Sequence, residues 1–445
     1  MKDETKVYGY EAYEIAKYAS TEIGSRLPGS KSEKKFADYM ADKLREIGIE
    51  PKQEEFSVSP RASIGGVPYA GYYGIAASAL VYLALGIPYV WYAIALSGVC
   101  LLLWLIFSVV LYKTWFDMFF KQRISQNTYG ELLPPDGKYD YTIMLSAHTD
   151  TSWNWKHSEH NYIYRNKPVL GFIAAYSKVG FGALCVFFLI ASSIAMTLVY
   201  NGVYFQSASA INTLNSASFN NFLFVMRFLP IVTAIGSAFV AMWADNDEEM
   251  GSRGAMDNAT GIGLSYELTK YFKEHPEKMP KNCRIIDFNC GAEEAGLRGS
   301  MNFTKVHKGE DILKNVWNIN IDSIADKDYF QVVIQDDWQF TRFDKDLEKM
   351  FKDTFAEMGI ESKTGGCIHN PVGGADSTPL TRAGIKSVTF AAQEPVLTYY
   401  YHTFRDTIDR FEPETVALGF DVVLSVIEKI DAFQQEHGFN GVNNK

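Results

Sequence analysis

Two long stretches of the chain contain no charged residue, and they divide its hydrophobic pattern into unlike parts. The first runs from Ala62 to Tyr112 and the second from Val179 to Met226. Because a membrane-spanning helix needs about 20 apolar residues, the first stretch is long enough for two spans. Gly86-Ile87-Pro88 near its middle would break a helix. We therefore expect a transmembrane hairpin over residues 62–112.

A second transmembrane hairpin is predicted over residues 168–244. We expect one span from Val179 to Tyr200 and another from Phe222 to Trp243, joined by the polar, uncharged segment 201–221. Arg227 lies near a span end, where an arginine can extend its guanidinium to the interface. Helices this apolar on every side would need a very large core to be buried in a water-soluble protein. The membrane interpretation is therefore preferred to buried core helices.

The remaining segments have the hydrophobic pattern of an α/β domain. Each hairpin crosses the membrane an even number of times, so these segments lie on one side and can fold together. Helical spacing of apolar residues predicts helices from Tyr10 to about Ile23 and from Lys31 to about Ile47, the second with Ser30 as its N-cap. Alternation over Pro51 to Val58 predicts a strand.

Three short apolar runs predict buried strands, and each ends in polar residues. They are Tyr141–Ala147, Arg284–Cys290 and Val316–Ile321. In an open α/β sheet, the loops beyond the carboxyl ends of strands converge on the ligand crevice. The side chains that follow these runs are therefore candidates for one site: His148, Glu293, Glu294 and Asp322.

Composition and charge exclude several classes of protein. The chain has 445 residues, of which 21% are charged, and its formal net charge is -10. It has no long Lys/Arg run, so a nucleic-acid protein is not expected. Five cysteines without CxxC spacing do not suggest a disulfide framework or a structural zinc knuckle. The acidic first residues, MKDETK, lack the apolar region of a signal peptide, so we expect no cleavage or export.

Two further segments carry residues suited to metal binding. Residues 254–261 read GAMDNATG and precede a helical pattern, and residues 399–407 read YYYHTFRDT. Taken alone, Asp257 would be a helix N-cap and His402 an ordinary loop histidine.

Together these motifs resemble the zinc aminopeptidase group of the M28 type of co-catalytic metallopeptidases. The resemblance includes the opening segment SRLPGSKSEKKFADYMADKLREIG and covers most of the chain outside the apolar stretches. It implies a zinc-exopeptidase-like α/β fold, in which a mixed, mostly parallel central sheet is flanked by helices. The motifs occur in the order the family has: SAHTD at 146–150, GAMDNATG at 254–261, GAEEAGLRGS at 291–300, NID at 320–322 and YHTFRDT at 401–407.

The resemblance implies two Zn²⁺ ions per chain. It makes Asp257 the carboxylate that bridges both metals, with Glu294 and His402 completing one site and His148 and Asp322 completing the other. Each ion then receives one imidazole and carboxylate oxygens but no thiolate, a set that suits zinc and tolerates Mn²⁺ or Co²⁺.

Three catalytic roles follow from the same resemblance. Asp150 is expected to accept a hydrogen bond from the ring N–H of His148. Glu293 matches the general base, which takes a proton from the attacking water and passes it to the leaving amine. Tyr401 matches a phenol that stabilises the oxyanion in some members, although the neighbouring Tyr399 and Tyr400 are alternative candidates for that ring.

The sequence departs from the family in three places. A long insertion separates His148 from Asp257, Ser377 follows Asp376 where a histidine is more usual, and Arg298 lies inside the GLRGS turn. Other residues near the motifs have simpler interpretations. The acidic stretch 245–249 is expected to be a solvated face, and Trp153 and Trp155 to line a pocket or the bilayer interface. Surface or rim positions are expected for His157, His160 and His369.

The predicted function is that of a membrane-anchored, zinc-dependent aminopeptidase that acts on peptides. The alternatives are a glutaminyl-cyclase-like transferase with one zinc, another exopeptidase specificity, or a non-catalytic membrane receptor or scaffold. The expected partners are a peptide substrate and the lipid bilayer, with no nucleic acid, and no oligomeric state is predicted. The peptidase domain would comprise residues 1–61, 113–167 and 245–445, interrupted by hairpins at 62–112 and 168–244.

The distribution of basic residues predicts the orientation in the membrane. Positive charge in short loops is retained in the cytoplasm. The far hairpin turns, at 86–89 and 201–221, contain no Lys or Arg. We therefore expect a multi-pass protein with four spans and a cytoplasmic catalytic lobe, whose side carries Arg61, Lys113, Lys121, Arg123, Lys167 and Lys178.

Overall fold

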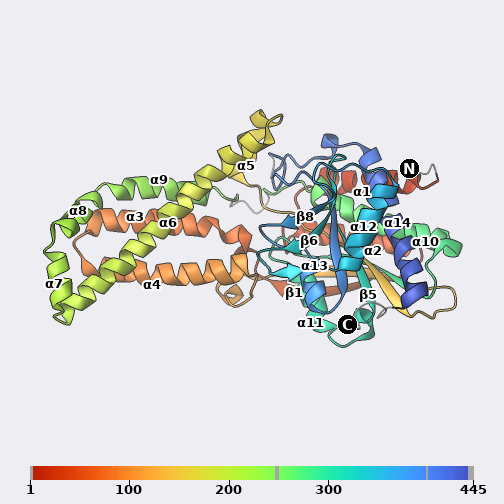
Figure 1. The fold of residues 1–445 in the computed structure, drawn as a ribbon, viewed down its shortest axis with the longest axis horizontal. Helices are drawn as coiled ribbons and strands as arrows, with labels where there is room; N and C mark the ends of the chain where they lie inside the picture. The colour runs from red at the N-terminus through yellow and green to blue at the C-terminus, as the bar shows by residue number, and fades with distance from the viewer. Residues whose placement is uncertain (1–3, 246–249, 397–398, 439–445) are drawn as a thin grey trace. The chain divides into compact units, whose positions relative to one another are not determined.

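The structure is a computed structural model that describes residues 4–245, 250–396 and 399–438 (Figure 1). The chain divides into two compact units. Unit 1 comprises residues 1–60, 117–154 and 247–445, and unit 2 comprises residues 61–116 and 155–246. Residues 155–167, which the sequence assigns to the peptidase domain, thus belong to unit 2.

Unit 1 is built on one nine-stranded sheet with the order β1-β2-β4-β3-β5-β9-β6-β7, and β8 pairs with β6. The central strands β4, β3, β5 and β9 run parallel, but four of the eight pairings are antiparallel. The sheet is mixed as predicted, although "mostly parallel" holds only for its centre. The strands are β1 (Lys52–Val58), β2 (Arg123–Leu132), β3 (Tyr141–His148), β4 (Cys283–Cys290), β5 (Val316–Ile324), β6 (Phe330–Asp336), β7 (Thr341–Arg342), β8 (Cys367–Asn370) and β9 (Lys386–Ala392).

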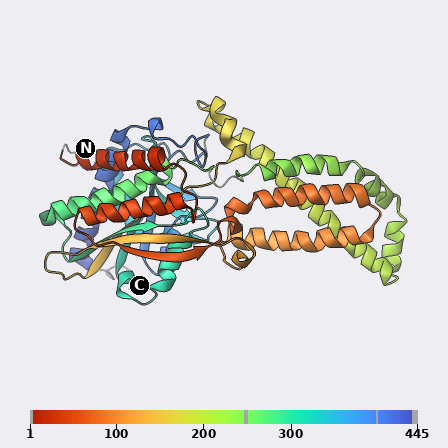
Figure 2. The same cartoon turned by 180° about the vertical axis from the view of Figure 1, so that it is seen from behind.

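Helices cover both faces of this sheet. Side chains alternate along β3, so that Ile143 and Leu145 join the larger core and Met144 joins a smaller core on the opposite face. Figure 2 shows α1 and α10, in red and green, side by side on the larger core. The larger core is covered by α1 (Lys6–Tyr18), α2 (Lys31–Glu46), α10 (Gly261–Glu274), α12 (Lys345–Glu357) and α14 (Pro413–His437), and the smaller by α11 (Arg298–Val306) and α13 (Ser377–Arg382).

The elements predicted in the soluble segments are confirmed. The first helix continues from α1 into a π-helical turn at Ala19–Ile23. The second is α2, in which the Ser30 hydroxyl accepts a hydrogen bond from Glu33 N at 3.1 Å as an N-cap. The three apolar runs are β3, β4 and β5. Asp322 lies inside β5 rather than after it, at an irregularity between Ile321 and Ile324.

Unit 2 is helical, and its first half is the expected helical hairpin. It is formed by α3 (Pro68–Ala84) and α4 (Pro88–Trp104), which are separated by residues 85–87. The second half contains α5 (Lys156–Glu159), α6 (Pro168–Tyr204), α7 (Ala208–Leu214), α8 (Ala217–Val225) and α9 (Leu229–Ala241).

The span predicted over 222–243 is not one straight helix. It is divided between α8 and α9, which are bent by 50° at a short break. Pro230 lies at the start of α9, where its missing N–H and fixed φ favour the beginning of a helix over its continuation.

Two helices in the described chain are long and apolar enough to cross a membrane. The first is Pro88–Val110, which is α4 continued by a π-helical segment at Leu105–Val110, and the second is α6. The bent pair α8–α9 would make a third. The helix α3, with 17 residues, is shorter than the first two helices and is not among them. The prediction of four spans is therefore confirmed in part, by helix length and composition, for two or three of them.

Small residues let the helices of unit 2 approach closely. A side chain at Gly71 would collide with the Ala241 backbone, and one at Gly182 would lie 2.3 Å from Gly236 O. Ser78 and Thr233 form a buried hydroxyl–hydroxyl hydrogen bond of 2.8 Å between α3 and α9. Small residues and interhelical hydroxyl bonds are typical of helix packing within membranes.

Several polar residues of unit 2 lie elsewhere than the sequence predicts. His157 is buried, with its ring stacked on Trp243 at a centroid distance of 4.7 Å and beside Trp155 at 5.3 Å. It is therefore not a surface residue, whereas His160 in this unit and His369 in unit 1 are exposed. Asp245 is also buried and pairs with Lys156 at 3.2 Å, and the rest of the acidic stretch, 246–249, lies outside the described residues.

Candidate metal centre

Five side chains from five segments converge at one end of the central strands. Two come from the sheet itself: His148 ends β3 and Asp322 lies in β5. Asp257 precedes α10, Glu294 lies in the turn after β4, and His402 lies in the loop before α14. All five are buried except Asp322, which is partly exposed.

Asp257 faces both histidines. Its Oδ1 lies 3.1 Å from His148 Nε2, and its Oδ2 lies 3.0 Å from His402 Nε2. The remaining carboxylates each approach one imidazole. Asp322 Oδ1 lies 3.8 Å from His148 Nε2, and Glu294 Oε1 lies 3.0 Å from His402 Nε2. The site therefore consists of two halves that share one carboxylate.

These residues fit two zinc ions. His148, Asp257 and Asp322 form one group and Asp257, Glu294 and His402 another, and within each the ligand atoms lie within 4.8 Å of one another. Each group offers one imidazole nitrogen and two carboxylates and contains no thiol, which suits zinc. Oε1 of Glu294 is buried, and its contact with His402 Nε2 at 3.0 Å lacks hydrogen-bond geometry, so a cation between the two atoms would satisfy both.

The electrostatics of the centre favour bound positive charge. Burial lowers the pKa of His402, but Glu294 and Asp257 outweigh it and raise that pKa to about 9. Burial raises the pKa of Asp257, but hydrogen bonds with His148 and His402 outweigh it and hold that pKa well below its usual range. Protons on the two imidazoles thus satisfy carboxylates that metal ions would satisfy in their place.

Asp150 supports the half of the centre that contains His148. Its backbone carbonyl lies 3.2 Å from His148 Nδ1, and its Oδ1 lies 3.4 Å from the same nitrogen. Its carboxylate also accepts hydrogen bonds from Glu293 N at 3.0 Å and Glu294 N at 2.9 Å. Asp150 therefore both contacts the histidine and fixes the turn that carries the two glutamates.

Asp406 holds the backbone of Asp257, as Asp150 holds the turn of the two glutamates. Its two carboxylate oxygens accept hydrogen bonds from Met256 N and Asp257 N, each at 3.0 Å. Burial raises the pKa of Asp406 to about 6, with Arg410 acting in the opposite direction. Sequence analysis assigned no role to Asp406, although this residue lies in the YHTFRDT motif.

Arg26 is a second supporting residue that the sequence analysis missed. Its guanidinium is fully buried and donates hydrogen bonds to the carbonyls of Thr149 and Gly254 at 2.9 and 2.8 Å. Burial lowers the pKa of Arg26 to about 10, while nearby carboxylates, led by Asp406, oppose that shift. Arg26 thus ties together the segments that follow His148 and precede Asp257.

Glu33 connects α2 to the turn that carries Glu293. Its Oε1 accepts hydrogen bonds from Ala292 N and from the Ser125 hydroxyl, both at 2.8 Å. Its Oε2 accepts one from Gly29 N at 2.6 Å. Both Arg26 and Glu33 lie in the opening motif SRLPGSKSE, which was the only sequence signal for them.

The proposed catalytic side chains lie beside the ligands. Glu293 is partly buried, and burial raises its pKa well above the usual value, although His148 opposes that shift. Tyr401 stacks on the His402 ring at a centroid distance of 3.8 Å. Burial, followed by the carboxylate of Asp257, raises the pKa of Tyr401, so its hydroxyl stays protonated at neutral pH.

The neighbouring tyrosine Tyr400 is used elsewhere. Its hydroxyl donates a hydrogen bond to Asp326 Oδ2 at 2.7 Å, and the Arg410 guanidinium lies 3.4 Å from its ring centroid. Tyr399 packs edge-to-face on Tyr400. Of the three adjacent phenols, Tyr401 is therefore the one whose ring contacts a metal-ligand candidate.

The two smaller departures from the family pattern have structural roles. Ser377 is buried, and its hydroxyl accepts a hydrogen bond from the Thr389 hydroxyl at 2.9 Å. Asp376 beside it accepts one from the Ser300 hydroxyl at 2.5 Å. Arg298 pairs with Asp117 at 3.1 Å. The contacts of Asp376 with Ser300 and of Arg298 with Asp117 tie the GLRGS turn to neighbouring segments of unit 1.

Comparison with known proteins finds similarity to peptidases. Residues 236–427 match Peptidase family M28. A curated relative, aminopeptidase YwaD of Bacillus subtilis (strain 168), is 27% identical over 188 residues, which are 40% of this chain. The chain spans 37% of the length of that relative.

Two solved structures share the fold at low sequence identity. A zinc aminopeptidase from Bacillus subtilis superposes with a TM-score of 0.52 at 14% identity, covering 95% of this chain and 94% of the other. An aminopeptidase from Aneurinibacillus sp. strain AM-1 gives 0.50 at 12% identity, with 96% and 93% covered. The chain thus has a region that matches Peptidase family M28 and an α/β fold similar to that of these zinc aminopeptidases.

Proposed function

We propose that this protein is a membrane-anchored, zinc-dependent aminopeptidase that removes N-terminal residues from peptides. The observation that carries the proposal is the position of Asp257, whose two oxygens face His148 and His402 at 3.1 and 3.0 Å. One carboxylate between two imidazoles is the arrangement that a pair of catalytic metal ions requires.

The chain supplies the proton transfers and the orientation. Two zinc ions, when bound, would supply Lewis acidity toward the scissile carbonyl and the attacking water. Glu293 would accept the water proton and return it to the leaving amine, because its carboxylate lies next to the ligands without being needed as one. The turn that carries it is held by Asp150 at Glu293 N, so the base is oriented before substrate binds.

Tyr401 would act on the carbonyl side of the reaction. Its phenol has a raised pKa, so it remains a hydrogen-bond donor at neutral pH. A donor aimed at the developing oxyanion stabilises the transition state more than the ground state.

The complete second half of the centre favours hydrolysis over the two non-hydrolytic alternatives. A glutaminyl-cyclase-like transferase with one zinc would not need His148 and Asp322 beside Asp257. A scaffold would not need an intact ligand set together with a general base.

Unit 2 is proposed to be the membrane anchor, with α3, α4, α6 and the bent pair α8–α9 as four crossings. Large apolar side chains remain exposed along it, including Leu83 at 80% and Leu96 at 72%. Such a surface in water would promote aggregation, whereas lipid would cover it. The helix α3, with 17 residues, also falls within the range of about 17–25 residues that spans a bilayer.

The decisive experiment combines metal analysis with activity on the purified full chain in detergent. We expect two zinc ions per chain, release of N-terminal residues from aminoacyl reporters, and no cyclisation of a glutaminyl peptide. One zinc with cyclisation would establish the transferase instead. Metal-free protein with neither activity would favour the scaffold.

The proposed cytoplasmic orientation has a separate test. Ser207→Cys places a thiol at an exposed position between α6 and α7, and Lys349→Cys places one on α12, where that side chain is 77% exposed. An impermeant thiol reagent on intact cells should label only Ser207→Cys, and permeabilised cells should show both. Labelling of Lys349→Cys in intact cells would place the catalytic unit outside.

A further inference from the structure

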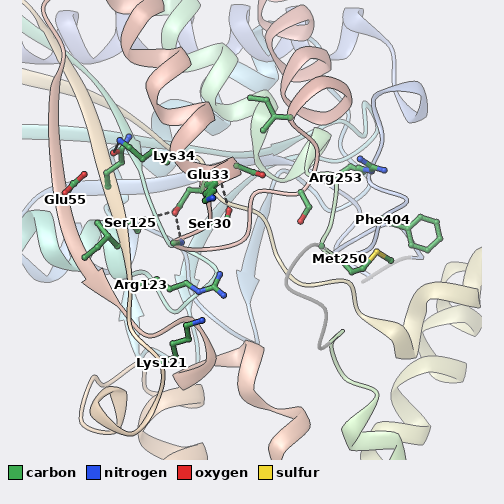
Figure 3. Close-up of a pocket in the computed structure, with 18 residues that line it drawn as sticks. Ser30, Glu33, Lys34, Glu55, Lys121, Arg123, Ser125, Met250, Arg253 and Phe404 are labelled. Atoms are coloured by element: carbon green, nitrogen blue, oxygen red, sulfur yellow. Dashed lines mark hydrogen bonds between the residues drawn. The ribbon is translucent and has the colours of Figure 1, made fainter.

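Unit 1 contains a large cavity that none of the five metal-ligand candidates lines. Its volume is about 1180 Å³. Its walls come from the start of α2, from residues 121–126 at the start of β2 and from residues 250–253, with Phe404 also lining it. In Figure 3, Lys121 and Arg123 lie on one side of the hollow and Arg253 lies with Phe404 on the other.

Positive charge dominates the cavity lining. The two lining carboxylates are Glu33 and Glu55, while the basic side chains are Lys31, Lys34, Lys121, Arg123 and Arg253. The Glu33 side chain is 1% exposed, and its carboxylate accepts hydrogen bonds from Ser125, Ala292 and Gly29, so these donors already offset its negative charge at the cavity wall. This surplus occurs in a chain whose net charge is -10, so the cavity is a local positive region in an acidic protein.

At least two of these cations are available to a ligand. Lys121 and Arg253 are both exposed, and neither forms an ion pair within the described residues. The first turn of α2 adds to the potential, because the amide end of a helix carries partial positive charge. An anionic ligand in this cavity would therefore gain charge–charge contacts without displacing an ion-pair partner of either side chain among residues 4–245, 250–396 and 399–438.

The cavity adjoins the segments that build the metal centre. Phe404 is two residues beyond His402, and its N–H donates to Asn154 Oδ1 at 3.2 Å. Glu33, below the cavity, accepts from Ala292 N beside Glu293. An aminopeptidase holds the first peptide bond at its metals, so the remainder of the peptide must extend away from them over such neighbouring surfaces.

We infer that the basic cavity binds the portion of a peptide substrate that follows the cleaved bond, and that it favours peptides with acidic residues in that portion. This inference rests on the proposed aminopeptidase function. A peptide is favoured over an anionic lipid headgroup because Phe404, two residues beyond His402, lines the cavity, and because Glu33 of the lining bonds Ala292 N beside Glu293.

The test uses matched peptides and the zinc-loaded full chain in detergent. The two peptides share their first two residues and differ in the next four, which are Asp and Glu in one and Asn and Gln in the other. We expect kcat/KM to be about tenfold higher for the acidic peptide at low ionic strength, from two or three modest surface ion pairs. The ratio should approach unity at about 0.5 M salt, because exposed charges are then screened.

The variant Lys121→Gln/Arg253→Gln should reduce that ratio to near unity. Its matched control is Lys349→Gln/Lys363→Gln, which removes two exposed lysines that already pair with Asp353 and Asp328 and should leave the ratio unchanged. Equal kcat/KM for both peptides in the wild-type protein would overturn the inference. So would an unchanged ratio in the cavity variant.

A binding measurement separates this inference from the proposed function. Fluorescence anisotropy with labelled acidic and neutral peptides, on the zinc-loaded Glu293→Gln protein, reports affinity without turnover. Tighter binding of the acidic peptide that is lost in the cavity variant supports the cavity even if no peptide is cleaved, in which case only the peptidase function fails. If the cavity variant instead loses affinity for phosphatidylglycerol vesicles and not for the peptide, the peptide assignment is overturned.

Discussion

The two halves of the metal centre share Asp257 but differ in how far solvent reaches them. In the half completed by Glu294 and His402, those side chains are 5% and 8% exposed. In the other half, Asp322 is 19% exposed. Because Asp322 is the more exposed member of its half while His148 is only 1% exposed, we propose that substrate would approach from the side of Asp322 and that an ion in this more open half would exchange more readily than one in the enclosed half.

Removal of Asp257 should have the largest effect, because it belongs to both halves. We expect Asp257→Ala to lose both zinc ions and all measurable peptidase activity. His402→Ala and His148→Ala should each weaken mainly one site, with the ion in the His148 half the easier to remove. Zinc per chain after dialysis against a chelator gives the answer, and two tightly held ions in Asp257→Ala protein would refute the bridging role.

The adjacent glutamates should separate chemistry from metal binding. Glu293→Gln should keep both ions and lower kcat by roughly 10²–10⁴, the range for loss of a general base. Glu294→Gln should instead release the ion of the enclosed half. Parallel zinc analysis and single-turnover kinetics distinguish the two, and the opposite pattern would exchange their roles.

The two supporting aspartates offer a smaller and more local contrast. Asp406→Asn should loosen the Asp257 backbone that both halves share, whereas Asp150→Asn should disturb the turn of Glu293 and Glu294 and the orientation of His148. Such outer partners typically contribute about 10–100-fold in metal affinity or activity. A zinc titration against a competing chelator measures the effect, with Asp346→Asn on α12 as the control.

Zinc affinity of the half that contains Glu294 and His402 should also depend on pH. In the metal-free protein the pKa of His402 is raised to about 9, so zinc must displace a proton below that pH. Zinc affinity there should therefore fall as pH falls, by about tenfold per unit for each proton displaced. Chelator competition at pH 6, 7 and 8 tests this, and an affinity independent of pH would contradict the protonated state.

Patterns of apolar residues predicted the centre of the fold well. The strands β3, β4 and β5 are rich in apolar residues, as strands buried on both faces are, although each also contains polar residues. The neighbouring strand β2 was missed because Gln126, Asn127 and Thr128 are buried yet polar. Asn127 is buried because its side chain bonds Gly291 N and Gly299 O, and those partners are far away in sequence.

The candidate site shows the same limit. Its ligands were named through the resemblance because each motif contains its own ligand. Arg26 and Asp406 act through backbone groups, which leave no residue-type pattern to recognise. His157 was misplaced for a related reason, because the ring of Trp243 that covers it lies far along the chain.

The scattered origin of the ligands has a consequence for synthesis of the protein. Translation adds them in the order His148, Asp257, Glu294, Asp322 and His402, with Asp406 after all of them. The more open half cannot be complete before Asp322, and the enclosed half cannot be complete before His402. Under the proposed assignment, a growing chain on the ribosome therefore has neither half of the metal centre complete until Asp322 has been added, and not both halves until His402 has been added.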